Sequence, residues 1–136
     1  MKTNKLMITL FALVLLVASC KDKEIHTQDS PYITVTSPTK NQVVQDNDSI
    51  RVEALIQPET GSVISYQVNL LSKKKHIIYE SREHCNCKDI KNISISKAFM
   101  YDTNKTSDML LQVQAELKDG TYIREEIPIK LVDSKK

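Results

Sequence analysis

From residue 32 onward, apolar and polar side chains alternate in short stretches that are separated by polar segments. In SIRVEALIQ, Ile50, Val52, Ala54 and Ile56 fall on one face of an extended chain, and mostly polar residues fall on the other. A period of two residues is typical of a half-buried β-strand. We therefore predict seven strands, at residues 32–36, 49–57, 63–71, 75–81, 90–99, 109–117 and 121–132.

The segments between these strands carry turn residues. Asp119-Gly120 lies between two alternating stretches, which is a strong signal for a β-hairpin. Pro128 interrupts the last predicted strand, so we expect an edge position or a bulge there. No segment keeps a period of 3.6 residues, and no long helix is predicted. This pattern predicts an all-β fold, an antiparallel β-sandwich of about seven strands.

The N-terminus follows a different pattern. Lys2 and Lys5 precede an apolar stretch of 13 residues, from Leu6 to Ala18. This stretch is shorter than the roughly 20 residues that a membrane-spanning helix needs. Its length and its basic flank are typical of a secretory signal peptide.

The end of this stretch, Leu16-Val17-Ala18-Ser19-Cys20, resembles the bacterial lipobox. The resemblance implies that residues 1–19 are a lipoprotein signal peptide and that Cys20 is lipidated on sulfur and acylated on its new N-terminus. More than one acyl chain would hold the protein firmly in a lipid membrane. Polar residues 20–31 are then a flexible tether, and residues 32–136 form the domain.

The charged residues after Cys20, Lys21-Asp22-Lys23-Glu24, resemble the export signals of surface lipoproteins in Bacteroides-type bacteria. The resemblance implies an outer-membrane lipoprotein. Its periplasmic or surface-exposed position stays open.

Two longer segments resemble the immunoglobulin-like domains of Bacteroides-type lipoproteins. ITVTSPTKNQVVQDNDSIRVEALI (33–56) is similar to their first two strands, and MLLQVQAELKDGTYIREEIPIKL (109–131) is similar to their last hairpin. The resemblance implies an immunoglobulin-like sandwich that serves as a binding or accessory module. The chain has no tryptophan, and Cys85 and Cys87 are too close in sequence to join the two sheets as in antibody domains.

Charge excludes one class of partner. The chain has 19 Lys and Arg against 17 Asp and Glu, a formal net charge of +2. Removal of residues 1–19, which hold two lysines and no acidic residue, brings this charge to zero. We therefore expect no nucleic-acid partner, and we interpret Lys73-Lys74-Lys75 as a solvated turn.

The sequence offers no catalytic set. It has no glycine-rich phosphate loop, no His-Glu-x-x-His and no Gly-x-Ser-x-Gly. Glu125 and Glu126 are adjacent acids, but on a strand their side chains point to opposite faces. Asp46-Asn47-Asp48 is better explained as a polar loop than as a calcium site. We predict that the protein is not an enzyme.

The remaining candidate chemistry is His84-Cys85-Asn86-Cys87. With Cys20 lipidated, Cys85 and Cys87 are the two remaining thiols of an exported chain, where paired thiols usually form disulfides. On an extended strand their Cα atoms would lie roughly 6.6 Å apart, close to the upper limit of about 6.8 Å for a disulfide. A bend at Asn86 would shorten this distance and leave a small, reducible ring.

Metal binding is the second interpretation of this motif. Side chains two residues apart on a strand share a face, and thiolates with an imidazole favour Cu(I) or Zn²⁺. His84, Cys85 and Cys87 supply three ligands, and a structural zinc site needs a fourth, for which His76 is a candidate. A redox-active or intermolecular cysteine pair is a third interpretation. We expect the motif in a link between strands at one end of the sandwich.

These observations predict a non-enzymatic, membrane-anchored lipoprotein whose immunoglobulin-like domain binds an envelope protein or a glycan. Binding would use the loops at one end of the sandwich or an open strand edge. The alternative is a soft-metal envelope protein that binds copper or zinc through His84, Cys85 and Cys87.

Overall fold

The structure is a computed structural model that describes residues 27–59, 62–87 and 90–134. These residues form eight strands and no helix. The strands are β1 (Ile33–Ser37), β2 (Gln42–Gln45), β3 (Ile50–Ile56), β4 (Val63–Ser72), β5 (Ile77–Cys87), β6 (Ile93–Phe99), β7 (Ser107–Leu117) and β8 (Tyr122–Val132).

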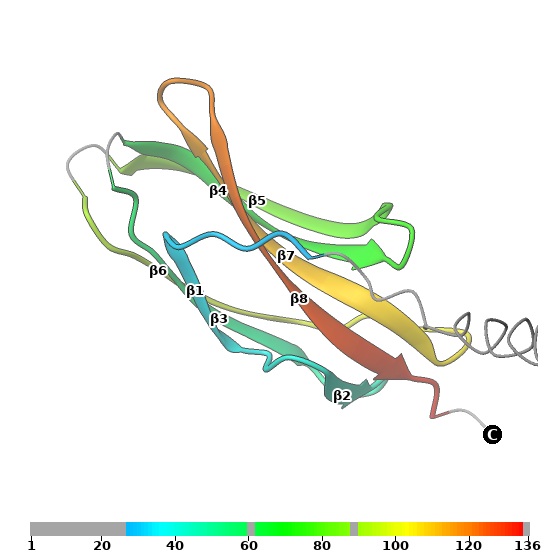
Figure 1. Cartoon of the computed structure of the whole chain (residues 1–136). Helices are drawn as coiled ribbons and strands as arrows, with labels where there is room; N and C mark the ends of the chain where they lie inside the picture. The colour runs from blue at the N-terminus through cyan, green and yellow to red at the C-terminus, as the bar shows by residue number, and fades with distance from the viewer. Residues whose placement is uncertain (1–26, 60–61, 88–89, 135–136) are drawn as a thin grey trace, which may run out of the picture.

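The strands form two sheets that pack face to face, as Figure 1 shows. One sheet has the order β1-β3-β6 and the other has the order β2-β8-β7-β4-β5. All strand pairs are antiparallel except β2 with β8. The second, fourth, fifth, seventh and eighth strands of the chain are thus in the larger sheet, with β4, β7 and β8 adjacent as C, F and G are in immunoglobulin folds. The predicted immunoglobulin-like antiparallel sandwich is confirmed.

The number of strands is eight rather than about seven, because β2 was not predicted. β2 is four residues long, and its register pairs Val44 with Leu131 of β8. Val44 is buried and Val43 is 56% exposed, so the strand alternates over too few positions to be recognised. The first strand of the fold is therefore divided: β1 belongs to one sheet and β2 to the other.

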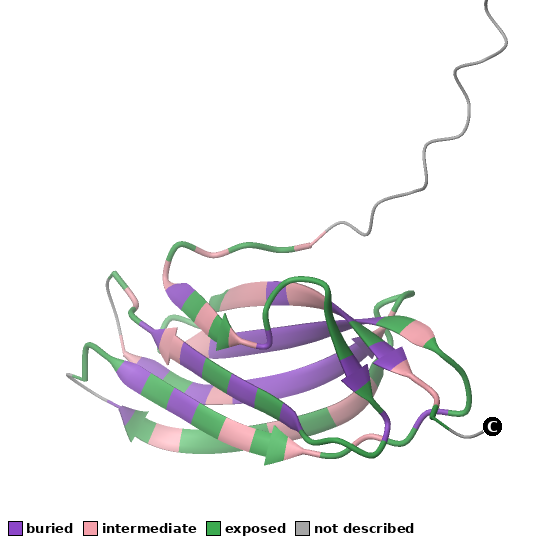
Figure 2. Ribbon diagram, turned by 90° about the horizontal axis from the view of Figure 1, so that it is seen from below, coloured by how far each residue is buried: buried purple, intermediate pink, exposed green. Residues whose placement is uncertain are grey.

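The core lies between the sheets and follows the predicted alternation. Ile50, Val52, Ala54 and Ile56 of β3 are all buried, and the residues between them are exposed or half-buried. The central strands of the larger sheet differ, since they are buried on both faces. Seven consecutive residues of β7, from Met109 to Ala115, are buried, and the central ribbons of Figure 2 are correspondingly continuous in purple.

The outward face of the larger sheet is buried by polar side chains and by two leucines, Leu71 and Leu110. We call the following set the outer amide layer: Gln67, Asn69, Gln112, Gln114 and Glu126. The Asn69 amide nitrogen donates to Gln112 Oε1 at 2.9 Å, and the side chain of Glu126, 1% exposed, pairs with Lys75 Nζ at 3.3 Å. Lys75 reaches over the sheet from the turn between β4 and β5, which is the turn expected at the three lysines.

Three connections lie at one end of the sandwich, which we call the loop end: β3 to β4, β5 to β6 and β7 to β8. The β7–β8 hairpin turns at Asp119-Gly120, as predicted, and Gly120 has a φ of 87°, which glycine adopts without strain. The turn between β4 and β5 lies at the opposite end.

The start of the described chain is attached to β8. The carbonyl oxygen of Gln28 accepts a hydrogen bond from the Glu126 N–H at 2.8 Å, and the Ser30 N–H donates to Glu125 Oε2 at 2.5 Å. The predicted signal peptide, Cys20 and the first part of the tether lie outside the described residues and stay predictions. Within the described ranges, no helix has the length and apolarity of a membrane span.

Candidate functional site

The His84–Cys87 motif forms the end of β5 and not the link that follows it, so that part of the prediction was wrong. The ladder between β4 and β5 continues through Ser65↔His84 and Val63↔Cys87. The polar residues Arg82, Glu83 and His84 interrupt the apolar alternation, so the predicted strand ended early. The strand persists because its backbone pairs with β4, which is a central strand.

An irregularity of the ladder brings the two cysteines together. Between Ser65 and Val63 the register advances by two residues on β4 and by three on β5, which is the signature of a β-bulge. The Cα atoms of Cys85 and Cys87 are 5.2 Å apart, shorter than the roughly 6.6 Å of a regular strand. Their sulfur atoms form a disulfide with an S–S distance of 2.04 Å.

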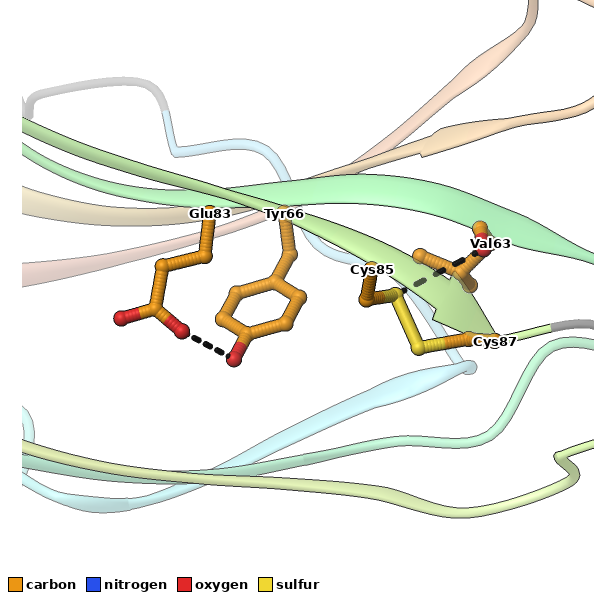
Figure 3. The surroundings of a disulfide bond; sticks show 5 residues. All are labelled: Val63, Tyr66, Glu83, Cys85 and Cys87. Carbon is orange, nitrogen blue, oxygen red and sulfur yellow. Dashed lines mark hydrogen bonds between the residues drawn. A yellow bond between two sulfur atoms is a disulfide. The ribbon is translucent and has the colours of Figure 1, made fainter.

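The disulfide faces the interior of the sandwich. Figure 3 shows Cys85 and Cys87 on the same side of the sheet as Tyr66 and Glu83. Cys87 is 7% exposed and belongs to the core, and Cys85 is half-buried against it. His84 follows Glu83 directly and therefore points to the opposite, solvent-facing side, where it is exposed.

This arrangement separates the three residues of the predicted metal site. The two sulfur atoms are bonded to each other, and thiolates are the form that binds metal. His84 lies on the other face of the sheet, and His76 lies in the turn at the far end of β5. In the described part of the chain, no three His, Cys, Asp or Glu residues are grouped as a metal site. A copper or zinc site at this motif would require reduction of the disulfide and movement of His84.

Beside the disulfide, side chains of β5 and β6, together with Tyr66 of β4, connect the edges of the two sheets. We call this set the β5–β6 seam: Tyr66, Tyr79, Ser81, Glu83, Lys97 and Phe99. Tyr79 and Phe99 stack with ring centroids 4.0 Å apart. Lys97 Nζ donates to Ser81 Oγ at 2.7 Å and forms an ion pair with Glu83. These contacts join residues 14, 16 and 20 positions apart, so no local sequence pattern could predict them.

Glu83 is the centre of this seam. Tyr66 Oη donates to its carboxylate at 2.5 Å, as the dashed line in Figure 3 marks. That hydrogen bond, together with partial burial, raises the pKa of Tyr66 to about 12. The hydrogen bonds from Lys97 and Tyr66 lower the pKa of Glu83 below its ordinary value. The seam therefore holds a carboxylate in its charged form and a phenol in its neutral form.

The loop end carries exposed apolar side chains. We call this set the loop-end patch: Ile64, Ile90 and Tyr122, which are 40%, 48% and 45% exposed. A shallow hollow of about 80 Å³ lies at the same end, lined by Tyr32, Pro58, Glu59, Leu117 and Ile123. The sequence pattern assigned these residues to strands or turns and gave no signal that they would lie at the same end of the sandwich.

Comparisons with known proteins give only distant similarities. No protein-family profile matches the sequence, and the search of curated proteins finds no match. One similar structure is that of the fibronectin(III)-like modules of Clostridium thermocellum CbhA, with 14% identity, 76% of this chain and 98% of that chain covered, and a TM-score of 0.47. CopC from Methylosinus trichosporium OB3b has 10% identity, coverages of 82% and 98%, and a TM-score of 0.47. Similarities of this degree carry no argument about function.

Proposed function

We propose that the protein is a non-enzymatic envelope lipoprotein, anchored to the outer membrane through acylated Cys20, whose sandwich domain binds a protein partner at its loop end. The observation that carries the binding role is the loop-end patch. Ile64, Ile90 and Tyr122 are exposed at the end where three connections meet. Exposed apolar side chains at one end of a domain can supply an interaction site.

Two features support the envelope location. The lipobox-like segment that ends at Cys20 indicates export and lipidation. The bond between Cys85 and Cys87 agrees with an oxidising compartment outside the cytoplasm, since disulfides are rare inside it. A protein partner fits the patch better than a glycan does, because two of its three residues, Ile64 and Ile90, are aliphatic. Aliphatic side chains bury apolar area and cannot form hydrogen bonds with sugar hydroxyls.

Site-specific photocrosslinking in living cells tests the binding role. A benzoylphenylalanine in place of Tyr122 should crosslink to one discrete envelope protein. The same residue in place of Met100, which is 63% exposed at the opposite end, is the matched control and should give no such product. Equal products from both positions, or none from Tyr122, would contradict a protein-binding loop end. Retention of the purified protein on an envelope polysaccharide without a protein crosslink would show a glycan partner instead.

Membrane fractionation tests the anchor separately. Wild-type protein should remain with the outer membrane after a high-salt wash, and Cys20→Ala should be recovered in the membrane-free fraction or as an unprocessed precursor. Mass spectrometry of the wild type should find acyl chains on Cys20. Processed Cys20→Ala protein that stays in washed membranes would show that lipid is not the anchor.

The copper or zinc alternative is tested by measuring the metal content of the purified wild-type protein with and without reductant.

A further inference from the structure

The Cys85–Cys87 disulfide joins two residues of the same strand, and it therefore ties β5 to no other element. Closing a loop of three residues removes little conformational entropy from the unfolded chain. The two sheets are held by their ladders and by the core between them. The disulfide therefore contributes little to the stability of the sandwich, and its position at the end of an edge strand needs another explanation.

The two cysteine residues differ in their exposure to solvent. Cys85 is half-buried, whereas Cys87 is 7% exposed and packs in the core. β5 is an edge strand, and side chains of β6 reach across to Tyr79, Ser81 and Glu83. Past Glu83, no hydrogen bond, ion pair or ring contact from described residues of β6 reaches either cysteine. Of the two cysteines, Cys85 is therefore the one more open to an incoming thiolate.

The backbone suits the reduced form as well as the oxidised form. Cys85 Sγ lies 3.6 Å from the carbonyl oxygen of Val63, the contact dashed in Figure 3. A disulfide sulfur carries no proton, so this contact becomes a hydrogen bond only when Cys85 is a thiol. The pairing of Cys87 with Val63 uses backbone atoms alone. Reduction therefore breaks the S–S bond without removing a strand partner, and it gives the Cys85 thiol an acceptor.

We propose that Cys85 and Cys87 form a thiol–disulfide exchange site, that its co-reactant is a protein or small-molecule dithiol, and that Cys85 carries the sulfur that is attacked. This inference goes beyond the binding role and does not depend on it.

The exchange proceeds in two displacements. A thiolate of the dithiol attacks Cys85 Sγ, forms a mixed disulfide with it and breaks the bond to Cys87, which leaves as a thiolate and takes up a proton. The second thiol of the co-reactant then loses its proton and attacks its own partner sulfur in the mixed disulfide. Cys85 is released as a thiolate and takes up a proton. Two electrons pass from the dithiol, which becomes a disulfide, to the cysteine pair.

Reduction of the native full-length protein by dithiothreitol is the first test. Trypsin cleavage after Arg82 and Lys88 releases one peptide, residues 83–88, that contains both cysteines and excludes Cys20. Alkylation of this peptide should show that the folded protein is reduced at a rate within about tenfold of the rate in urea. Circular dichroism should show the strands retained after reduction. A bond that resists dithiothreitol until the domain unfolds would overturn the proposal.

The second test asks which sulfur reacts. With glutathione disulfide as the probe, Cys85 in the Cys87→Ser protein should form the mixed disulfide at least about tenfold faster than Cys87 in the matched Cys85→Ser protein. Brief treatment of the wild type with glutathione, followed by acid quenching, reports the same preference without a substitution. Fragmentation of the 83–88 peptide should place glutathione on Cys85. Glutathione mainly on Cys87, or equal rates in the two variants, would overturn the assignment of Cys85.

Discussion

The central strands and the edge strand of the larger sheet are built by different means. β7 has seven consecutive buried residues and β4 has five, whereas in β5, of the same length as β7, only Cys87 is buried. The central strands are held by apolar packing on one face and by the outer amide layer on the other. β5 is held by its ladder to β4 and by the few polar and aromatic contacts of the seam.

This difference assigns separate tasks to the two regions. Burial on both faces makes β4 and β7 the source of stability, because buried apolar area is the dominant favourable term in folding. β5 contributes little burial and instead presents charged groups, a free strand edge and the disulfide. Substitutions in the two regions should therefore differ in size and also in the property that they change.

The largest expected effect is in the central region. Leu111→Ala, at a residue that is 0% exposed, should lower the free energy of unfolding by about 2–5 kcal/mol, because it leaves a cavity between the sheets. Ile77→Ala on β5, where the side chain is 54% exposed, should change it by less than about 0.5 kcal/mol. Urea denaturation of both variants measures the difference. Similar losses in the two variants would remove the distinction between the strands.

The second-largest change in the free energy of unfolding is expected in the outer amide layer. Asn69→Ala leaves the buried Gln112 Oε1 without its donor and should lower the free energy of unfolding by about 1–3 kcal/mol. Glu80→Ala, directly opposite Asn69 on β5 and exposed, is the matched control and should be near neutral. A neutral Asn69→Ala variant in the same urea titration would show that these amides do not stabilise the outward face.

Loss of the disulfide should lower the free energy of unfolding less than Leu111→Ala or Asn69→Ala does. Loop closure over three residues predicts that Cys85→Ala/Cys87→Ala lowers the free energy of unfolding by at most about 1.6 kcal/mol. The slope of the urea transition should stay that of the wild type, since the same surface becomes exposed on unfolding. A loss as large as that of Leu111→Ala would make the bond a structural staple and would weaken the exchange proposal.

The smallest expected effect is a change in the pH dependence of the free energy of unfolding, to which Tyr66 and Glu83 contribute. Tyr66 has a folded-state pKa of about 12, above the ordinary value of about 10. Its contribution to stability is therefore complete below about pH 10 and lost as the pH rises towards 12. Glu83 has a lowered pKa, so its contribution is present above the ordinary carboxylate range and lost on acidification.

Stability profiles against pH check this expectation. Tyr66→Phe should flatten the alkaline fall relative to the wild type, and Lys97→Met should flatten the acidic fall. Tyr79→Phe, which keeps the ring that stacks on Phe99, is the control for the loss of a phenol. Profiles of Tyr66→Phe and the wild type that coincide above pH 10 would show that the Tyr66–Glu83 hydrogen bond is not formed in solution.

Periodicity predicted the fold because most strands bury one face. The alternation at Ile50 to Ile56 and the Asp119-Gly120 turn are local signals, and both reappear in the structure. β2 escaped prediction because its four residues become a strand only through pairing with β8. The missed end of β5 has the same cause, since a pairing partner and not its own apolar pattern keeps it extended.

The candidate site was predictable only in part. The spacing of Cys85 and Cys87 left a small ring, a metal site and a redox-active or intermolecular pair open, and it indicated that a bend at Asn86 would shorten the distance between their Cα atoms. A bulge opposite Val63 provides that bend, and it depends on how β4 and β5 align. The burial of Glu126 under Lys75 joins residues 51 positions apart, and no local pattern reports such a contact.

The division of the first strand has a mechanical consequence. Any pull on the chain before Thr27 enters the domain through the hydrogen bonds of Gln28 and Ser30 to β8. It then meets β1, which is bonded to β3 in one sheet, and β2, which is bonded to β8 in the other. Tension from the N-terminal side therefore acts first on the pairing of β1 with β3 and reaches the pairing of β2 with β8 only after β1 has detached. A domain held by its N-terminus is thus fastened to both sheets in succession.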